Sequence, residues 1–261
     1  MAKSAAFQLR FLGTGTSQGV PVIGCECAVC VSTDLRNNRL RSSVLIQSDS
    51  TTVVIDTGPD FRQQMLRAKP ERLDAVVFTH EHKDHVAGLD DVRAFNFKQQ
   101  QDMPLYCTEG VERALRREFH YAFAEHKYPG VPNLTFERIA ESPFWIGDLE
   151  FIPIQVWHHK LPVLGFRIGD LSYITDANAI EPKELEKVKG SKILILNALR
   201  ISPHVSHFNL TEALNVAEYI GAEQTYFTHI SHYLGLHHEV SHTLPKSVQL
   251  ATDGLSIEVG R

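Results

Sequence analysis

Four potential metal ligands lie within six residues of this sequence: His80, His82, Asp84 and His85. They directly follow the apolar run 75–78, which has the length and composition of a buried strand. In an extended segment residues i and i+2 face the same side, so the first two histidines would point together, and the loop after them can turn the other two side chains toward a neighbouring point. This segment could therefore serve two metal ions. The alternative is a polar turn exposed after a strand.

Three of the four cysteines form a second cluster, Cys25, Cys27 and Cys30, while Cys107 is remote and fits a buried strand position. Cysteines that form a disulfide framework are usually spread along the chain, so this spacing favours metal binding. Three thiolates are one ligand short of a closed tetrahedral zinc site. The alternative is a set of buried or redox-exchanging thiols.

The overall composition indicates a folded protein that binds small molecules. The chain has 261 residues, 43% hydrophobic and 22% charged, without repeats or linkers, so we expect one domain over residues 1–261. It shows neither a signal peptide nor an 18-residue apolar run, and we expect a cytoplasmic protein without membrane contact. The net charge of −5 argues against an extended nucleic-acid interface, whereas a metal site could still bind a small anion.

The order of the predicted elements defines the fold class. Strands follow one another in the first half and alternate with helices later, which predicts an α/β fold: an αββα sandwich of two mixed β-sheets with helices on the outer faces. The strand-like runs are 7–12, 43–47, 52–55, 75–78, 149–154, 164–168, 172–175, 193–196, 225–227 and 255–259. The helical patterns are 61–68, 111–123 and 210–220, the last with a capping box formed by Asn209 and Glu212.

The histidine-rich segment and four later motifs resemble the signature of the metallo-β-lactamase superfamily of metallohydrolases. Besides the segment at residues 79–85, the matching positions are Asp56, His158, Asp176 and His229, each after an apolar run. The resemblance implies that one metal takes His80, His82 and His158, that a second takes Asp84, His85 and His229, and that Asp176 bridges them. It also implies that Asp56 supports the loop without binding metal. His159 is the alternative to His158.

This ligand set implies a hydrolase with a dinuclear centre. Imidazole and carboxylate donors suit zinc, manganese or iron, and we expect two divalent ions, Mn or Zn. Two such ions can share and activate a hydroxide at neutral pH, which would cleave an ester, amide or phosphodiester. Asp84 would then belong to the catalytic residues as well as to the ligands.

Further motifs resemble the PhnP-type phosphodiesterases. In that family a histidine three residues after the last ligand completes a structural zinc site, which here implies Cys25, Cys27, Cys30 and His232. A histidine before the capped helix protonates the leaving oxygen, which implies that His207 is the general acid, with His204 as the alternative. The resemblance implies a small cyclic or nucleotide-like phosphodiester as substrate and is compatible with a homodimer.

Several points stay open in the sequence. Lys160, Arg167 and Arg200 lie near the motifs and are candidates for binding substrate phosphate, although each is also explained as solvated surface charge. A tRNA 3′-processing nuclease would share the ligand motifs, but the segment 97–149 shows no long basic arm insertion. A PqqB-like cofactor-biosynthesis protein would share the fold and the cysteine cluster, but departs from the complete dinuclear ligand set.

Overall fold

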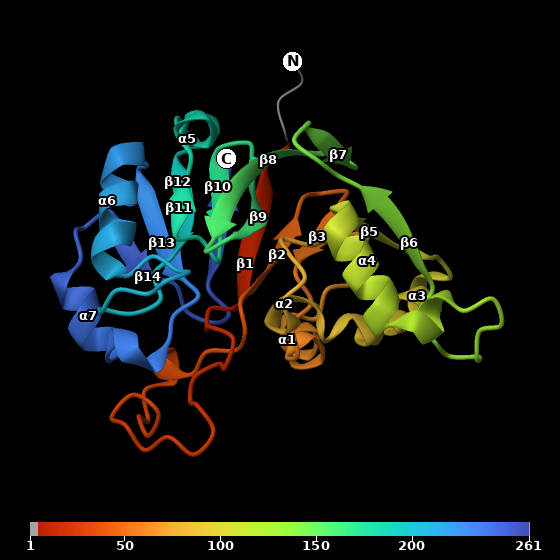
Figure 1. Cartoon of the computed structure of the whole chain (residues 1–261), viewed down its shortest axis with the longest axis horizontal. Coiled ribbons are helices and arrows are strands. Elements are labelled where there is room, and N and C mark those ends of the chain that lie inside the picture. The colour runs from red at the N-terminus through yellow and green to blue at the C-terminus, as the bar shows by residue number, and fades with distance from the viewer. Residues whose placement is uncertain (1–4, 261) are drawn as a thin grey trace.

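The computed structural model describes residues 5–260 and contains two β-sheets packed face to face, with helices on their outer sides (Figure 1). This confirms the predicted αββα sandwich. The first sheet has the strand order β15-β1-β2-β3-β4-β5-β6, and the second has the order β11-β8-β9-β10-β12-β13-β14, with β7 paired to β8. Both sheets are mixed, because antiparallel pairs at one side give way to parallel pairs at the other.

The first sheet and its helices come mainly from the first half of the chain. Its strands are β1 (Phe7–Gly13), β2 (Ser43–Gln47), β3 (Thr52–Ile55), β4 (Ala75–Val77), β5 (Met103–Cys107), β6 (Leu134–Arg138) and β15 (Ser256–Val259). Its helices are α1 (Phe61–Ala68), α2 (Lys83–Val86), α3 (Arg93–Gln99) and α4 (Glu109–Glu118). The predicted helix 111–123 is therefore a shorter helix followed by the 3₁₀ turn His120–Phe123.

The second sheet follows in the chain. Its strands are β7 (Phe144–Ile146), β8 (Leu149–His158), β9 (Leu161–Ile168), β10 (Leu171–Ile174), β11 (Ala179–Ile180), β12 (Ile193–Asn197), β13 (Gln224–Thr228) and β14 (Val248–Leu250). Its helices are α5 (Pro182–Val188), α6 (Leu210–Ile220) and α7 (His237–Thr243). Among the described residues no helix is both long and apolar enough to cross a membrane.

Alternating side chains build three apolar layers. In β2, Val44 and Ile46 face the second sheet, whereas Leu45 faces the helices of the first. In β10, Tyr173 points into the layer between the sheets and Ile174 points toward the outer helices. This period of two is what an extended chain buried on both faces requires.

The long segment after β1 is fixed to the sandwich by a buried arginine. Arg39 donates to Thr14 Oγ1 at 2.7 Å, to the Ala251 carbonyl at 2.5 Å and to His237 Nδ1 at 3.1 Å. A buried guanidinium needs such acceptors, because an unpaired buried charge is costly. The segment that carries the three cysteines thus starts and ends at fixed points.

Candidate metal centre and zinc site

The predicted ligands converge because their strands end at one edge. Strands β3 and β4 are parallel, as are β10, β12 and β13, so their carboxyl ends point in a common direction within each sheet. Ligand sites in α/β sheets lie outside the carboxyl ends of the strands. The motif residues at or just after the ends of β3, β4, β8, β10 and β13 therefore meet in one place.

Three of these residues have an unusual backbone conformation. Asp56, Asp176 and His229 have φ angles of 65°, 54° and 55°. Side chains other than glycine rarely adopt this left-handed region, and such strain is typically found at functional sites. The strained residues turn the chain sharply at the strand ends, which directs their side chains into the site.

One group of donors is tightly clustered. Asp84, His85, Asp176 and His229 each offer an atom within 4.8 Å of all the others. His85 Nε2 lies 3.2 Å from a carboxylate oxygen of Asp84 and 3.2 Å from one of Asp176, and His229 Nδ1 lies 3.1 Å from the same Asp176 oxygen. These are the residues to which the family resemblance assigns the second metal and the bridge.

The donors assigned to the first metal lie beside this group. The ring centroids of His80 and His82 are 4.6 Å apart, and those of His82 and His158 are 5.1 Å apart. His80 Nε2 is buried and has no hydrogen-bond partner among the described residues, as expected of an atom that would bind a cation. His159 is exposed and its amide donates to Asn178, so His158 is the better placed of the two. Their roles as ligands stay predictions.

Hydrogen bonds hold the outer sides of these rings. Asp56 Oδ2 lies 2.7 Å from His85 Nδ1 and accepts from the Thr79 hydroxyl at 2.8 Å; its supporting role stays a prediction. His158 Nδ1 lies 2.8 Å from the Ser206 carbonyl oxygen, which therefore accepts its proton and leaves Nε2 free as a ligand.

Sequence reasoning missed two threonines at this site. The Thr79 hydroxyl lies 3.0 Å from His80 Nδ1, and the Thr16 hydroxyl lies 3.3 Å from His229 Nε2. The first stands directly before the histidine motif, and the second lies in a glycine-containing turn that the spacing identified only as a turn. The only sequence signal for a role of Thr79 was its position next to a predicted ligand, and Thr16 offered only its place in the turn.

The charges of the donors suit a cation. Burial lowers the pKa of His80 and of His82, so both imidazoles stay neutral and keep a lone pair available. Burial opposes ionisation of Asp176, but the neighbouring His229 and His85 hold its pKa well below the usual range. Burial opposes protonation of His85, but the neighbouring carboxylates, chiefly that of Asp176, raise its pKa, so a cation bound at its Nε2 would replace a proton.

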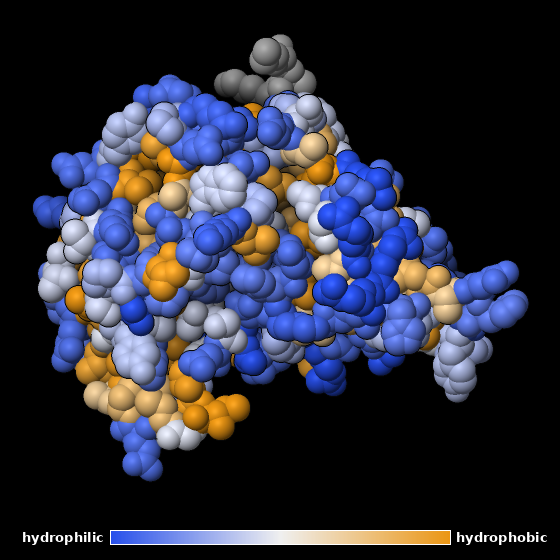
Figure 2. Space-filling model, in the orientation of Figure 1, coloured by the Kyte–Doolittle hydropathy of each residue, from blue (hydrophilic) through white to orange (hydrophobic). Residues whose placement is uncertain are grey.

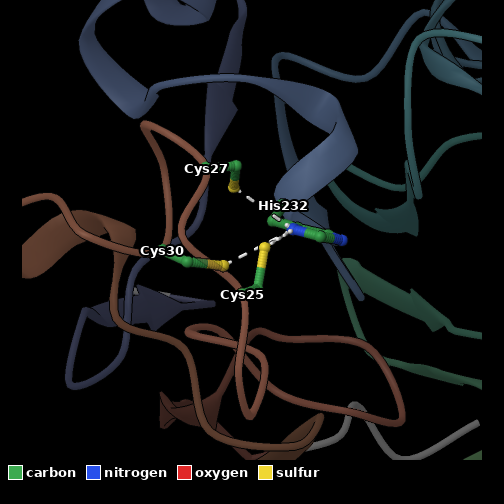
Figure 3. A group of neighbouring side chains, drawn as sticks. All are labelled: Cys25, Cys27, Cys30 and His232. Atoms are coloured by element: carbon green, nitrogen blue, oxygen red, sulfur yellow. Dashed lines mark hydrogen bonds between the residues drawn. The ribbon is translucent and has the colours of Figure 1, made fainter.

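The cysteine cluster and His232 form a second compact site (Figure 3). The sulfur atoms of Cys25, Cys27 and Cys30 lie 3.3, 3.3 and 3.4 Å from His232 Nδ1. A tetrahedral zinc ion with bonds of about 2.3 Å to sulfur and about 2.0 Å to nitrogen would place these atoms about 3.5 Å apart. A single ring nitrogen cannot hydrogen-bond well to three sulfurs, so the geometry fits a metal better.

The loop around the cysteines has little apolar core of its own. Figure 2 shows apolar residues on the surface at the base of the molecule, over this loop. Ile23 is 101% exposed, Leu35 79% and Val31 61%, so their side chains do not stabilise the loop by burial. A loop of this kind depends on ligand bonds for its structure, which supports a metal at the cysteines.

His207 lies between the candidate metal centre and an open pocket. Its Nδ1 lies 3.9 Å from Asp176 Oδ1, and its ring centroid lies 4.5 Å from that of His158. On the other side it lines a pocket of about 180 Å³ together with His204 and residues 16–18. A larger pocket of about 400 Å³ beside α6 is remote from these histidines. His207 is therefore better placed than His204 to reach a group bound at the metals.

The structure gives different roles to two of the three basic residues that were candidates for phosphate binding. Arg167 donates to the carbonyl oxygens of Lys187, Lys189 and Gly190 at the end of α5, so it serves to cap that helix. Arg200, in contrast, lines the pocket next to His207.

Comparisons with known proteins agree with this geometry. The family model of the beta-lactamase superfamily domain matches residues 51–230, a span that includes all the predicted catalytic metal ligands. A solved structure described as a new diphosphatase from the PhnP family is 42% identical, with a TM-score of 0.91 over 97% of both chains. The structure of zinc-bound PqqB from Methylobacterium extorquens, 19% identical with a TM-score of 0.79 over 96% of this chain, shares the fold.

Curated relatives extend the comparison. An octanoyltransferase of Porphyromonas gingivalis is 39% identical over 94% of this chain, but the match spans only 50% of that protein. A ribonuclease Z of an Exiguobacterium species is 27% identical over 62% of this chain and 48% of that protein. This chain thus corresponds to about half the length of these two relatives. Its ligand motifs, its layered fold and the match over residues 51–230 together show that it belongs to the metallo-β-lactamase superfamily, close to the PhnP family.

Proposed function

We propose that this protein is a metal-dependent phosphodiesterase that hydrolyses a small cyclic or nucleotide-like phosphodiester, with His207 as the general acid. The observation that carries the proposal is the position of His207 between the clustered ligands and the polar pocket. When bound, two divalent ions would supply an activated water and positive charge for the phosphoryl oxygens. The residues His80, His82, His158, Asp84, His85, His229 and Asp176 would hold them.

The side chains near the phosphorus would have two roles: to orient the metal ligands and to donate a proton. Asp56, Thr79 and Thr16 keep the ligand rings oriented, which fixes the substrate relative to His207. His207 would donate a proton to the departing oxygen, so that a poor alkoxide leaving group departs as an alcohol.

The protonation of His207 depends on what is bound beside it. In the protein alone, burial and the charge of His229 lower the pKa of His207 to about 3. A phosphodiester carries a negative charge, and an anion next to the ring favours the imidazolium form. His207 would therefore act as an acid only where the charge of the substrate outweighs burial and the neighbouring positive charges.

The first experiment compares leaving groups. We would measure hydrolysis of bis(4-nitrophenyl) phosphate and of a 2′,3′-cyclic nucleotide, using wild type and His207→Ala loaded with manganese or zinc. Nitrophenolate leaves without a proton, so the variant should lose about 10²- to 10⁴-fold only on the cyclic nucleotide. Metal content, measured in parallel, should stay unchanged.

Three outcomes would count against the proposal. Equal losses on both substrates would show that His207 acts as a ligand or structural residue instead of an acid. No hydrolysis of any diester by wild type with both ions bound would remove the phosphodiesterase assignment, as would activity unaffected by Asp84→Ala.

Diphosphate esters are the second candidate substrate class, since the neighbour at 42% identity is described as a diphosphatase. The tRNA 3′-processing alternative is less well supported. The segment after Phe97 is occupied mostly by β5, α4, β6 and β7, and its longest connection, residues 124–133, spans only ten residues. Because this chain matches half of the octanoyltransferase, acyl transfer is not carried over to it.

A further inference from the structure

Another pocket lies between α1 and the two ends of the loop that carries the cysteines. Val20 and Asn38 come from the loop ends, Arg67 from α1 and Asp253 from the turn after β14. Its volume is about 370 Å³, within the range of roughly 300–1,000 Å³ that is typical of small-molecule sites. None of the described residues that line it also lines the pocket beside His207, so the proposed reaction does not use it. We call it the Arg67 pocket.

The acid in this pocket is already satisfied by the protein. Asp253 is nearly buried, and its two oxygens accept from the Thr14 hydroxyl and from the Leu40 amide, each at 2.8 Å. Arg67 Nη1 lies 3.5 Å from Asp253 Oδ2. A carboxylate with these partners has little capacity left for a cationic ligand.

Positive charge is in excess in the Arg67 pocket. Arg39 and Arg67 both line it, and Asp253 is the single acid among the described residues that do so. Burial lowers the pKa of Arg39 only to about 10, so this guanidinium stays charged at neutral pH. Asp34 also acts on Arg39, but it is itself paired with Arg36 at 2.7 Å. One positive charge is therefore left over, which favours a monoanion.

Arg67 has donors available for such an anion. Its side chain is 40% exposed, and besides Asp253 it contacts the Leu12 carbonyl oxygen through Nη2. A guanidinium has five N–H groups, more than these two contacts use, and its planar fork matches a carboxylate. The exposed side-chain amides of Asn38 and Gln63 line the same pocket and can add hydrogen bonds to the anion.

Apolar side chains form the rest of the wall. Val20 is buried and Leu40 is half-buried, whereas Pro21 is exposed and Leu35 is 79% exposed. An aliphatic chain in the pocket would cover this exposed apolar surface, and each methylene that it buries adds to the affinity.

We propose that the Arg67 pocket binds a small aliphatic carboxylic acid, with its carboxylate on Arg67 and its chain on Leu35 and Pro21. The excess positive charge selects the head group, and the apolar wall selects the chain. This site is separate from the metal centre, and its occupation does not depend on which ester the enzyme hydrolyses.

The test follows amide chemical shifts by NMR of the zinc-loaded protein during titration with butanoate, pentanoate and hexanoate. The amides of Asn38 and Leu40 should shift, and the Kd should fall by about two- to fourfold with each added methylene. Hexan-1-ol lacks the charge and hexylamine reverses it, so both should bind about tenfold or more weakly than hexanoate. A carboxylate that binds only at the catalytic zinc ions would instead shift residues 80–85.

Two pairs of variants test the two parts of the pocket. Arg67→Gln should raise the Kd of hexanoate by about 10- to 100-fold, whereas Arg62→Gln, on the same helix but outside the pocket, should not change it. Leu35→Ser should raise this Kd by about three- to tenfold. Ile23→Ser is its control, since Ile23 is also exposed on the loop but does not line the pocket.

The inference is overturned if hexanoate leaves the amides of Asn38 and Leu40 unshifted or if hexylamine binds as well as hexanoate. It is also overturned if each variant binds hexanoate like its control. Leu35 is exposed, so its replacement leaves the core intact and tests the pocket independently of the folding of Arg67→Gln. The titrations need no turnover, so failure of the proposed function would not affect them.

Discussion

Replacing Asp56 with asparagine tests whether this buried carboxylate positions a metal ligand. Asp56 is fully buried and accepts from the Thr79 amide at 2.9 Å and the Thr79 hydroxyl at 2.8 Å, with His85 Nδ1 at 2.7 Å. Asparagine tolerates the left-handed backbone at this position and has the same shape. The change therefore alters the hydrogen bonds and leaves the fold in place.

The amide can satisfy only part of this network. Its oxygen can accept from the Thr79 amide, but its NH₂ group then faces His85 Nδ1. That contact favours the tautomer with the proton on Nε2, which is the nitrogen directed at Asp84 and Asp176. Loss of such an orienting partner costs about 10- to 100-fold in metal affinity, and a hydrogen bond to a charged group contributes about 1.5–3 kcal/mol.

Metal affinity is the direct measurement. Competition with a chromophoric chelator should show one site weakened by about 10- to 100-fold in Asp56→Asn, with the cysteine site unchanged. Asp60→Asn is the matched control, since Asp60 lies in the same loop and accepts from the Arg41 amide at 2.8 Å without touching a ligand. Wild-type affinity at both catalytic sites in Asp56→Asn would refute the orienting role.

Three further changes test other parts of the structure. Gly58→Ala should lower the free energy of unfolding by about 1–3 kcal/mol, because a Cβ there would collide with the Asp84 carbonyl oxygen. Gly110→Ala in helix α4, where a Cβ has room, should stabilise the protein slightly. Thermal melting measures both effects. Cys27→Ser should lose one zinc per chain and lower the melting temperature, as elemental analysis and calorimetry would show. Burial and a neighbouring guanidinium lower the pKa of His237 to about 4, so the unfolded chain binds its proton first. The contribution of neutral His237 to the free energy of unfolding should be fully present above about pH 6.5 and should be lost, by the order of 2 kcal/mol, as the pH falls toward about 4. Urea unfolding at several pH values should show this fall in wild type and a smaller fall in His237→Asn.

Local signals explain which elements were predictable. The ranges 43–47, 52–55, 61–68 and 210–220 match β2, β3, α1 and α6, because buried apolar runs and caps define them. The capping box of Asn209 and Glu212 is present as expected. In contrast, the polar edge strand β6 and the helix α3 were missed, since their sequences show neither a clear alternation of period two nor a clear helical period.

The candidate site was predictable in identity but not in geometry. The spacing of His80 to His85 predicts a metal-binding segment, and family motifs add the remaining ligands. The sequence does not show that Thr16 contacts His229, because the two are 213 residues apart and meet only after both sheets form. Nor does it show that Arg167 caps a helix while Arg200 faces a pocket, since both have the same side chain.

The strained strand ends explain why the site needs the whole sandwich. Asp56, Asp176 and His229 hold left-handed conformations, which cost of the order of 1 kcal/mol or more each unless neighbouring structure enforces them. Neighbouring structure holds this conformation at His229. The next residue, Ile230, donates its amide to the Thr14 carbonyl at 2.9 Å and accepts from the Thr16 amide at 3.1 Å. Alanine at these positions would therefore remove a ligand or support and also add backbone strain, so its effect mixes two causes. Glycine lacks the functional group just as alanine does but adopts the left-handed backbone freely, so the difference in stability between alanine and glycine variants at each position would report the backbone strain.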